Sequence, residues 1–368
     1  MRRKTFPLTS VRFFLACFVL FHHSVRPFFP VFSARGDHGV PEDFLGIVSL
    51  AFPASASFFF LLSGYVLSLV YLRNGQVIEI RRFFAARFAR LYPLYFVMLI
   101  LTTPELLATQ VQRHGMRIGS INTAEIFAAN VAMLPVWYPS RLLQIDLPSW
   151  SLCGEVFFYA CFPLLGALLW RLRGTWLWMT ALTLYVAGQV LVWKMRTQIG
   201  FELVMVLPPL HLSTFALGML LARWQTLQQE QDRKRQIRVW QASAVLVVSA
   251  GAAVLSVFMV PFFRVPAPYN DGLLAPVFAG FIWALSATSM PLSRWLSARW
   301  LVALGNSSYA LYLIHMPILS LFQHLHWVTV SFYPVFVALC VGLSLLSFHY
   351  FETPARYWLV ERFHAWLP

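Results

Sequence analysis

Two ionisable residues interrupt the first apolar run of the chain, residues 11–23, and their spacing suits acid–base chemistry. In a helix, the eleven residues from Arg12 to His23 make about three turns plus roughly 20°, so both side chains share a face, roughly 16 Å apart. His22 then points roughly 100° away from His23. A neutral imidazole can act as a general base, and ionisable groups at mid-membrane depth usually serve a function.

Residues 58–68 form a second apolar run, which contains Ser63 and Gly64 and is expected to bring Ser63 to the depth of His23. The Ser63 hydroxyl is suited to donate a hydrogen bond to a developing oxyanion. The alternative is that Ser63 and Gly64 are small residues at a helix–helix contact.

Arg87 and Arg90 open a third run, three residues apart and therefore on one helix face. At the inner surface of a membrane they could clamp phosphate groups through charge-assisted hydrogen bonds. The alternative is that they only set the topology, because positive residues accumulate on the inner side of membrane proteins.

Trp150, Ser151 and Glu155 lie at the start of a fourth run, with Ser151 and Glu155 four residues apart on one face. A helix that starts near Pro148 at the outer surface places Glu155 about 10 Å into the bilayer. A carboxylate at that depth needs a histidine or arginine partner, or else it is neutral. The alternative is a structural hydrogen bond.

Ser308, Tyr312 and His315 fall within a narrow arc of a later helix, and His315 lies about 20 Å above its inner end. The alternative for His315 is a satisfied histidine at a helix contact. Further along the chain, His324 is expected in a short, solvated outer loop. His349, Glu352 and Arg356 predict a polar cluster at the inner interface.

The elements that must position these residues are membrane-spanning helices. The chain has 368 residues, of which 59% are hydrophobic and only 11% are charged, so we expect an all-α polytopic membrane protein. Its net charge of +14 comes from short clusters between apolar runs, as membrane topology requires, and argues against nucleic acid as a partner. Membrane lipids with acidic headgroups and a phosphate-bearing ligand are the expected partners.

Ten apolar segments have spanning length, and a shorter one at 122–136 is interpreted as a re-entrant or interfacial piece of a long outer loop. No zinc signature or glycine-rich phosphate loop is present, the four cysteines lie in apolar runs as packing residues, and we expect no metal. The predicted spans are 8–29, 47–72, 88–108, 151–170, 175–194, 203–222, 240–260, 272–290, 301–323 and 329–351.

Loop charge supports ten spans with both termini in the cytoplasm. That topology places 19 Lys and Arg residues on the inner side and 8 on the outer side, with Arg12 inside the first span. A crossing by 122–136 would move the basic cluster 233–238 outside. Because the chain ends soon after the last span, we expect one integral-membrane domain, residues 1–368, without a further soluble domain.

Taken together, these motifs resemble those of the membrane-bound acyltransferase-3 family, in order and over almost the whole chain. Its motifs are matched by Arg12 and His23; by Phe58, Phe59, Ser63 and Gly64, with Tyr65 in place of the usual phenylalanine; by Arg87, Arg90 and Pro93; by Trp150, Ser151, Leu152 and Glu155; by Ser308, Tyr309, Tyr312, Leu313 and His315; and by Phe351, Glu352, Pro354 and Arg356.

The resemblance implies an O-acetyltransferase of the inner (plasma) membrane, without the esterase-like domain that some members carry. It would move an acyl group, usually acetyl from acetyl-CoA, to a hydroxyl of a glycan, exopolysaccharide or glycolipid, including a lipid-linked saccharide. In that reading His23 is the general base, oriented by Glu155, and Ser63 or Tyr309 is the oxyanion donor. Arg87 and Arg90, with Arg12, face the phosphates of the donor, and Arg12 and His315 are further catalytic candidates. The other residues expected at the donor site are Gly64, Trp150, Ser151 and Ser308.

A second hypothesis is a proton-coupled secondary transporter of an anionic solute. His23, Glu155 and His315 would then form a proton relay. The sequence shows no inverted repeat and no paired broken helices of the kind that many transporters have, and binding of labelled acetyl-CoA would separate the two classes.

Overall fold

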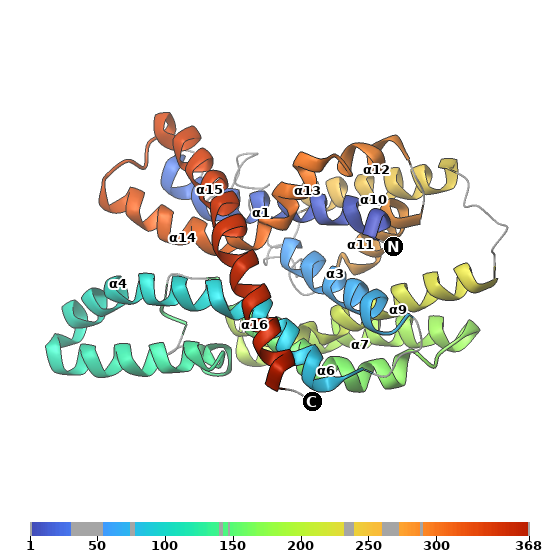
Figure 1. Ribbon diagram of the computed structural model, residues 1–368, viewed down its shortest axis with the longest axis horizontal. Helices are drawn as coiled ribbons and strands as arrows, with labels where there is room; N and C mark the ends of the chain where they lie inside the picture. The colour runs from blue at the N-terminus through green and yellow to red at the C-terminus, as the bar shows by residue number, and fades with distance from the viewer. Residues whose placement is uncertain are drawn as a thin grey trace. The chain divides into compact units, whose positions relative to one another are not determined.

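Every regular element in the described part of the chain is a helix (Figure 1). Seven of these helices are long and apolar enough to cross a membrane, which confirms the all-α, multi-span class. The computed structural model describes residues 2–30, 54–73, 78–139, 143–145, 148–231, 239–259, 272–287 and 290–366.

Each of the ten predicted spans overlaps a helix of the described chain, although residues 47–53 of the second span lie outside it. Three predicted spans fall on helices that are interrupted or short. The span 203–222 is divided between α8 (Phe201–Val206) and α9 (Pro208–Gln231), and the span 301–323 between α13 (Arg299–Asn306) and α14 (Ser308–His324). The third, 272–290, corresponds to α11 (Ala275–Ala287).

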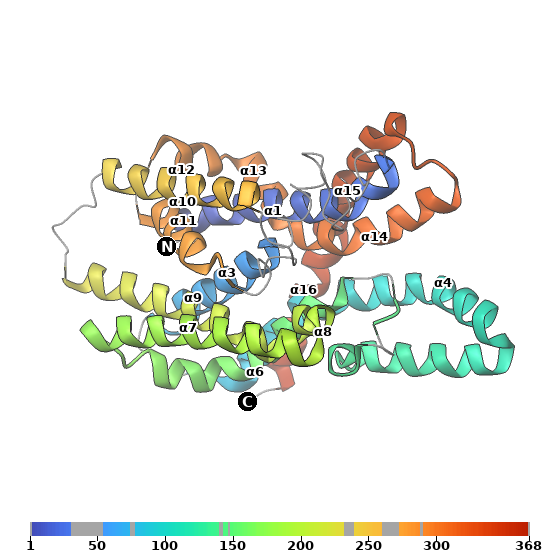
Figure 2. The same ribbon diagram turned by 180° about the vertical axis from the view of Figure 1, so that it is seen from behind.

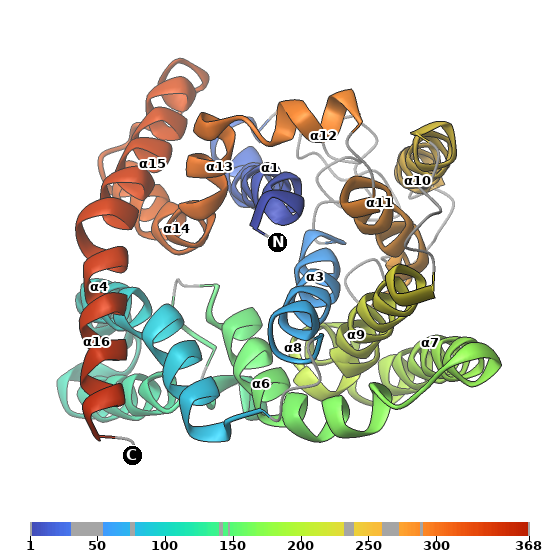
Figure 3. The ribbon, with the colours of Figure 1, turned by 45° about the vertical axis from the view of Figure 1, so that its right-hand side comes forward.

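The described residues group into two compact units. Unit 1 comprises residues 1–78, 161–200 and 210–308. Within it, α1 packs against α11 and α13, and α1 and α13 lie side by side in Figure 3. Its helices are α1 (Arg2–Phe28), α3 (Ala54–Tyr71), α7 (Gly174–Ile199), α9, α10 (Val239–Met259), α11, α12 (Pro291–Leu296) and α13.

The helices α3 and α9 of unit 1 approach each other closely through two glycines. A Cβ atom at Gly64 would collide with the carbonyl oxygen of Phe215, and a Cβ atom at Gly218 would collide with that of Leu61. Small residues allow helix backbones inside membranes to come this close. The surroundings of Gly64 are therefore those of a helix–helix contact.

Unit 2 comprises residues 79–160, 201–209 and 309–368. It includes the first part of α6, whose second part belongs to unit 1. The elements of unit 2 are α4 (Ile80–Val131), η2 (Pro135–Trp137), the start of α6 (Ser149–Leu169), α8, α14, η5 (Val330–Phe332), α15 (Tyr333–Ser347), η6 (Phe348–Glu352) and α16 (Thr353–Trp366).

The helix α4 continues well beyond the predicted span 88–108 and folds back on itself at Gly115, whose φ of 77° suits a residue without a side chain (Figure 2). The Tyr92 hydroxyl donates to the carbonyl oxygen of Val131 at 3.0 Å, and the Tyr95 hydroxyl to that of Asn130 at 3.0 Å. The returning arm, which holds most of the segment 122–136, therefore reaches the level of Tyr92 and Tyr95.

The last predicted span does not end at residue 351, because α15, η6 and α16 follow one another without a gap as far as Trp366. The segment η6 is a π-helix, in which the backbone N–H and the hydroxyl of Thr353 both donate to the carbonyl oxygen of Phe348, the hydroxyl at 2.7 Å. Beyond it, α16 packs on α4, and Phe363 meets Phe88 with ring centroids 6.1 Å apart (Figure 3).

Candidate active site

Arg12 and His23 lie on α1, which is helical without interruption between them. The predicted helix is confirmed, so the two side chains share a face. Both are half-buried in unit 1, as is His22, whose ring centroid lies 5.3 Å from that of His23. The structure does not separate the roles of the two histidines, and the assignment of His23 as the base stays a prediction.

Ser63 is half-buried in α3. Two residues later, Tyr65 of the same helix begins a hydrogen-bond chain that sequence analysis did not find. The buried Tyr65 hydroxyl donates to Oε1 of Gln225, and Nε2 of Gln225 donates to Oγ of Ser286 at 3.0 Å. These partners explain how tyrosine can replace the phenylalanine of the family motif at this buried position. Elsewhere in unit 1, Ser308 is buried and donates to the carbonyl oxygen of Gly305 at 2.8 Å.

In unit 2, Tyr159 of α6 joins two of the predicted motifs. Its hydroxyl donates to Oε2 of Glu155 at 3.1 Å, and Cζ of Arg87 lies 6.0 Å from the centre of its ring. Tyr159 also interacts electrostatically with Arg90. Glu155 is therefore in one polar cluster with both arginines. Sequence analysis missed Tyr159, although its position four residues after Glu155 puts the two on one helix face.

Two tyrosines of α14 hold this helix against α4 and α6. The Tyr309 hydroxyl donates to the carbonyl oxygen of Leu91 at 2.6 Å, and the Tyr312 hydroxyl lies 2.6 Å from Oγ of Ser151. Tyr309 also interacts electrostatically with Glu155 and Arg90, and so extends the cluster around Tyr159.

His315 is completely buried, one turn of α14 beyond Leu311, and its Nδ1 lies 3.1 Å from the carbonyl oxygen of that residue. Its ring centroid lies 6.2 Å from that of Tyr312. Trp150 is half-buried at the start of α6. The predicted link between Glu155 and His23 stays a prediction.

The depth of Glu155 below the outer surface stays a prediction. The start of α6 is placed by its contacts within unit 2. Ser151 contacts Tyr312, and Tyr309, one turn earlier in α14, contacts Leu91 near the beginning of α4. The helix α6 therefore starts beside the part of α4 that follows Arg87 and Arg90. The cause is the returning arm of α4, which brings the chain back to Tyr92 before α6 begins.

The prediction for His324 is only partly right, and the predicted cluster of His349, Glu352 and Arg356 at the inner interface stays a prediction. His324 is the last residue of α14 rather than a loop residue; its Nδ1 lies 2.9 Å from the carbonyl oxygen of Ser320, whose hydroxyl donates to Glu105 at 2.6 Å. His349 is exposed on η6, whereas Glu352 is half-buried and interacts electrostatically with Tyr309. Glu352 therefore belongs with the cluster around Tyr159.

The chemistry of this unit 2 cluster suits an anionic ligand with a polar, hydrogen-bonding partner. Two guanidinium groups, two carboxylates and buried hydroxyls are present, and arginine is well suited to phosphate. All four cysteines are free thiols, and Cys153 and Cys340 are buried. Among the described residues, no group of three or more His, Cys, Asp or Glu residues is placed to hold a metal ion.

The chain is similar to known acyltransferases. The family described as acyltransferase domain matches residues 8–349. The O-acetyltransferase OatA of Staphylococcus aureus is 26% identical over 318 residues, which cover 81% of this chain and 51% of that protein. The acyltransferase MdmB of Streptomyces mycarofaciens is 27% identical over 332 residues, which cover 85% of this chain and 78% of that protein. The chain thus spans about half the length of OatA. No solved structure matches it.

Proposed function

We propose that this chain, which belongs to the membrane-bound acyltransferase-3 family, transfers an acyl group from cytoplasmic acyl-CoA to a hydroxyl of a glycan, exopolysaccharide or glycolipid. Acetyl is the proposed group, and the inner membrane is the proposed location. One observation carries the proposal: three motifs that are far apart in the sequence meet around Tyr159 through Arg87, Glu155 and Tyr309.

Arg87 and Arg90 are the proposed contacts for the phosphates of the donor. Tyr159 and Glu155 support this role, because the carboxylate accepts from Tyr159 and the ring of Tyr159 faces the guanidinium of Arg87. A guanidinium has five N–H donors, so stacking on the ring of Tyr159 is compatible with binding of a phosphate by Arg87. The narrow pantetheine arm of acyl-CoA would then carry the thioester away from the inner surface.

His23 is the proposed general base, with Arg12 on the same helix face. The acceptor hydroxyl gives its proton to the imidazole while its oxygen forms a bond to the thioester carbonyl carbon. The C–S bond then breaks, and the proton passes from the imidazole to the leaving thiolate. General-base catalysis of this kind contributes about 10²–10⁴ in rate.

Ser63 is the proposed donor to the oxyanion, in preference to Tyr309. A phenol has a single proton, and that of Tyr309 is donated to the carbonyl oxygen of Leu91. Tyr309 and Ser151 are therefore proposed as positioning residues, which fix α14 against α4 and α6. His315 is proposed to act from within α14, where its Nδ1 contacts the carbonyl oxygen of Leu311.

The proposal is tested with the purified chain in lipid nanodiscs and acetyl-CoA labelled in the acetyl group. We expect saturable binding and slow hydrolysis of the thioester, or transfer when a suitable oligosaccharide is added. A His23→Gln variant should bind the donor and lose both reactions. Failure of the wild-type protein to bind acetyl-CoA would contradict the proposal and favour the transporter hypothesis. Label that stays on the protein without acceptor would indicate an acyl-enzyme instead of direct transfer.

A further inference from the structure

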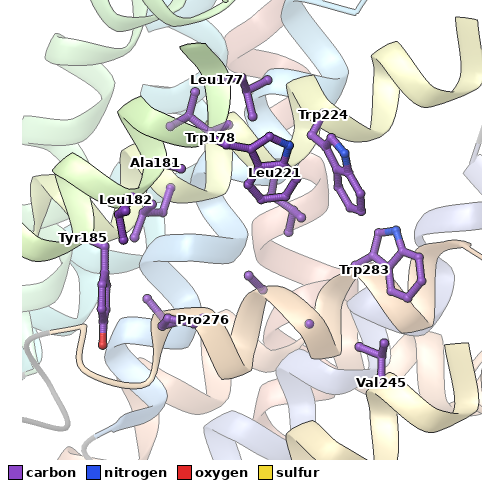
Figure 4. Close-up of a pocket in the computed structure, with 15 residues that line it drawn as sticks. Leu177, Trp178, Ala181, Leu182, Tyr185, Leu221, Trp224, Val245, Pro276 and Trp283 are labelled. Atoms are coloured by element: carbon purple, nitrogen blue, oxygen red, sulfur yellow. The ribbon is translucent and has the colours of Figure 1, made fainter. Parts of the chain in front are cut away.

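A polar pocket of about 370 Å³ lies between α4 and α14, entirely within unit 2. Its volume falls within the range of about 300–1,000 Å³ that is typical of small-molecule sites. The lining residues used below are Glu105, Ala108, Thr109, Gln112, Ser320 and His324. A cavity of about 500 Å³ in unit 1 is different, because apolar and aromatic side chains make up its wall and select no particular ligand (Figure 4).

The polar pocket lies further along α4 and α14 than the arginine cluster. Tyr309 of α14 contacts Leu91 of α4, and later in both helices Ser320 contacts Glu105. The two helices therefore run in the same direction, and the rise of a helix puts the pocket roughly 16–21 Å beyond the level of Leu91. In the topology predicted from loop charge, both helices reach the outer surface here. The pocket is therefore separate from the proposed donor contacts.

The carboxylate of Glu105 is held in place and remains accessible. The hydroxyl of the buried Ser320 lies 2.6 Å from both carboxylate oxygens and donates its one proton to them. A carboxylate has about four acceptor positions, so others remain for a ligand. Because 36% of the Glu105 side chain is exposed and this residue lines the pocket, a ligand can reach these positions.

His324 adds a second acceptor. Its Nδ1 lies 2.9 Å from the carbonyl oxygen of Ser320, and because a carbonyl oxygen only accepts, Nδ1 carries the proton. In the neutral ring Nε2 is then an acceptor, and it has no partner among the described residues. The same Nδ1 lies 4.0 Å from Oε1 of Glu105, which favours this tautomer. Since 66% of the His324 side chain is exposed, Nε2 is open to a ligand.

Thr109 and Gln112 extend the polar wall along α4. They follow Glu105 by four and seven residues, so the three side chains form one stripe on the helix. A hydroxyl and an amide each donate and accept. An ammonium group, which only donates, would leave the amide N–H groups of Gln112 without an acceptor.

The charge of the pocket disfavours an anionic ligand. The described residues that line it include a carboxylate and no lysine or arginine. An anion would therefore be repelled by Glu105 without a counter-charge in the wall. The pocket suits an uncharged ligand with several hydroxyl groups, each of which both donates and accepts, as the wall does.

From these features we infer that the pocket between α4 and α14 binds an uncharged sugar unit of the acyl acceptor. The contacts are Glu105, Thr109, Gln112 and His324. Ser320 is a positioning residue, because it acts by holding the carboxylate of Glu105. The inference rests on the proposed function and narrows it, since the acceptor then carries neither a uronate nor a phosphate on the sugar that enters this pocket.

The inference is tested by saturation-transfer NMR with the full chain in nanodiscs and matched sets of methyl glycosides. The sets are those of glucose, galactose and mannose, each with its uronate and its 6-amino-6-deoxy counterpart, which differ from it only at C6. We expect the neutral member of at least one set to bind saturably and its uronate to bind at least about tenfold more weakly. The 6-amino member should bind no more tightly than the neutral one.

Glu105→Gln keeps the shape of the side chain but removes its charge. This variant should bind the neutral glycoside about tenfold more weakly, because a charge-assisted hydrogen bond is replaced by an ordinary one. It should also lose the discrimination against the uronate, so that both members bind with similar affinity. The matched control is Glu125→Gln, at an exposed position on the returning arm of α4 and outside the pocket wall, which should keep both properties.

Two further variants keep the test decisive if Glu105→Gln does not fold. Ala108→Trp fills the pocket from α4 and should abolish binding of the neutral glycoside, whereas Leu101→Trp, at an exposed position outside the pocket wall, should preserve it. Thr109→Val should weaken binding roughly two- to tenfold. Thr103→Val should not, because its hydroxyl bonds to the carbonyl oxygen of Leu99 in its own helix at 2.7 Å.

The inference is overturned if no neutral glycoside binds, if the uronate binds as tightly as the neutral member, if the 6-amino member binds more tightly, or if Ala108→Trp and Leu101→Trp bind alike. Neither donor binding nor acyl transfer is measured. A chain that binds these glycosides but ignores acetyl-CoA would therefore contradict only the proposed function, and one that binds acetyl-CoA but no glycoside would overturn only this inference.

Discussion

The hydroxyl oxygens of Ser151 and Tyr312 lie 2.6 Å apart and join α6 to α14 across 161 positions of the sequence. Ser151 belongs to the motif that also contains Glu155, and Tyr312 to the one that contains His315. The hydrogen bond therefore couples the carboxylate of the unit 2 cluster to the buried histidine of α14 through two helices.

This coupling predicts a non-additive effect on stability. Ser151→Ala and Tyr312→Phe should each lower the free energy of unfolding. The double variant should lose less than the sum of the two single losses, and the difference should be about 0.6 kcal/mol and at most ~1.7 kcal/mol for a hydrogen bond inside a membrane protein. The free energies of unfolding of the wild type and the three variants, measured in mixed micelles, complete this double-mutant cycle. As a control, Thr102→Ala, whose hydroxyl bonds only to its own helix, should be additive with Tyr312→Phe.

His22 and His23 should not be equivalent, although their rings are neighbours. Since only His23 shares a face with Arg12, His23→Ala should abolish transfer while the protein still inserts and binds the donor. His23→Gln should be nearly as inactive, because the amide cannot act as a base. His22→Ala should keep substantial activity. Transfer assays decide, and an inactive His22→Ala beside an active His23→Ala would refute the assignment.

Arg87→Ala and Arg90→Ala should weaken donor binding more than they slow the chemical step. Losing a charge-assisted contact to phosphate should lower acetyl-CoA affinity roughly 10–150-fold. Arg82→Ala is the control, because Arg82 is exposed and pairs with Glu79 at 2.9 Å. Calorimetric titration with acetyl-CoA gives the affinities. If all three variants bind alike, Arg87 and Arg90 act only as topology signals.

Gly64→Ala should destabilise the protein by about 1–3 kcal/mol, because the new methyl group would force α3 and α9 apart. Gly251→Ala on α10 is the control, since a Cβ atom there meets nothing within 4 Å. Thermal unfolding in detergent measures the stability of the Gly64→Ala and Gly251→Ala variants. A Gly64→Ala variant that is stable but fails to bind acetyl-CoA would instead support the predicted role of Gly64 in donor binding.

The loop 105–150 should face outside, with 122–136 not crossing the membrane. Single cysteines at position 117, near the turn of α4, and at position 235, which lies outside the described residues, should react with an impermeant maleimide from opposite sides. The four native cysteines must first be replaced. Reaction of both positions from one side would exclude the ten-span topology.

The helices that carry the motifs could be predicted from the sequence, because a membrane span is recognised by its run of hydrophobic residues. The residues from Arg12 to His23 and from Ser63 to Tyr65 lie on single helices as predicted. Each of these predictions uses only neighbours along the chain, and the rise and turn of a helix then fix which residues share a face.

The contacts between motifs could not be predicted from the sequence in the same way. Nothing in the polar stretch around Gly115 indicates that α4 continues and folds back, yet this return decides where α6 begins and hence which residues Glu155 meets. Tyr159 carries no motif of its own. It belongs to the cluster because Arg87 approaches its ring from another helix. The periodicity of one segment does not predict a contact between two helices.

The π-helical segment η6 makes the last helix tolerant of the loss of one residue. A π-helix holds one residue more than the α-helix that would replace it, and Tyr350 within it is 79% exposed. Deleting Tyr350 would return the segment to an α-helix with nearly the same total turn, because five π-helical residues turn the chain about as far as four α-helical ones. Phe363 would then stay beside Phe88, whereas the loss of one residue from the α-helical part of α16 before Phe363 would rotate the rest of that helix by roughly 100° and separate the two rings.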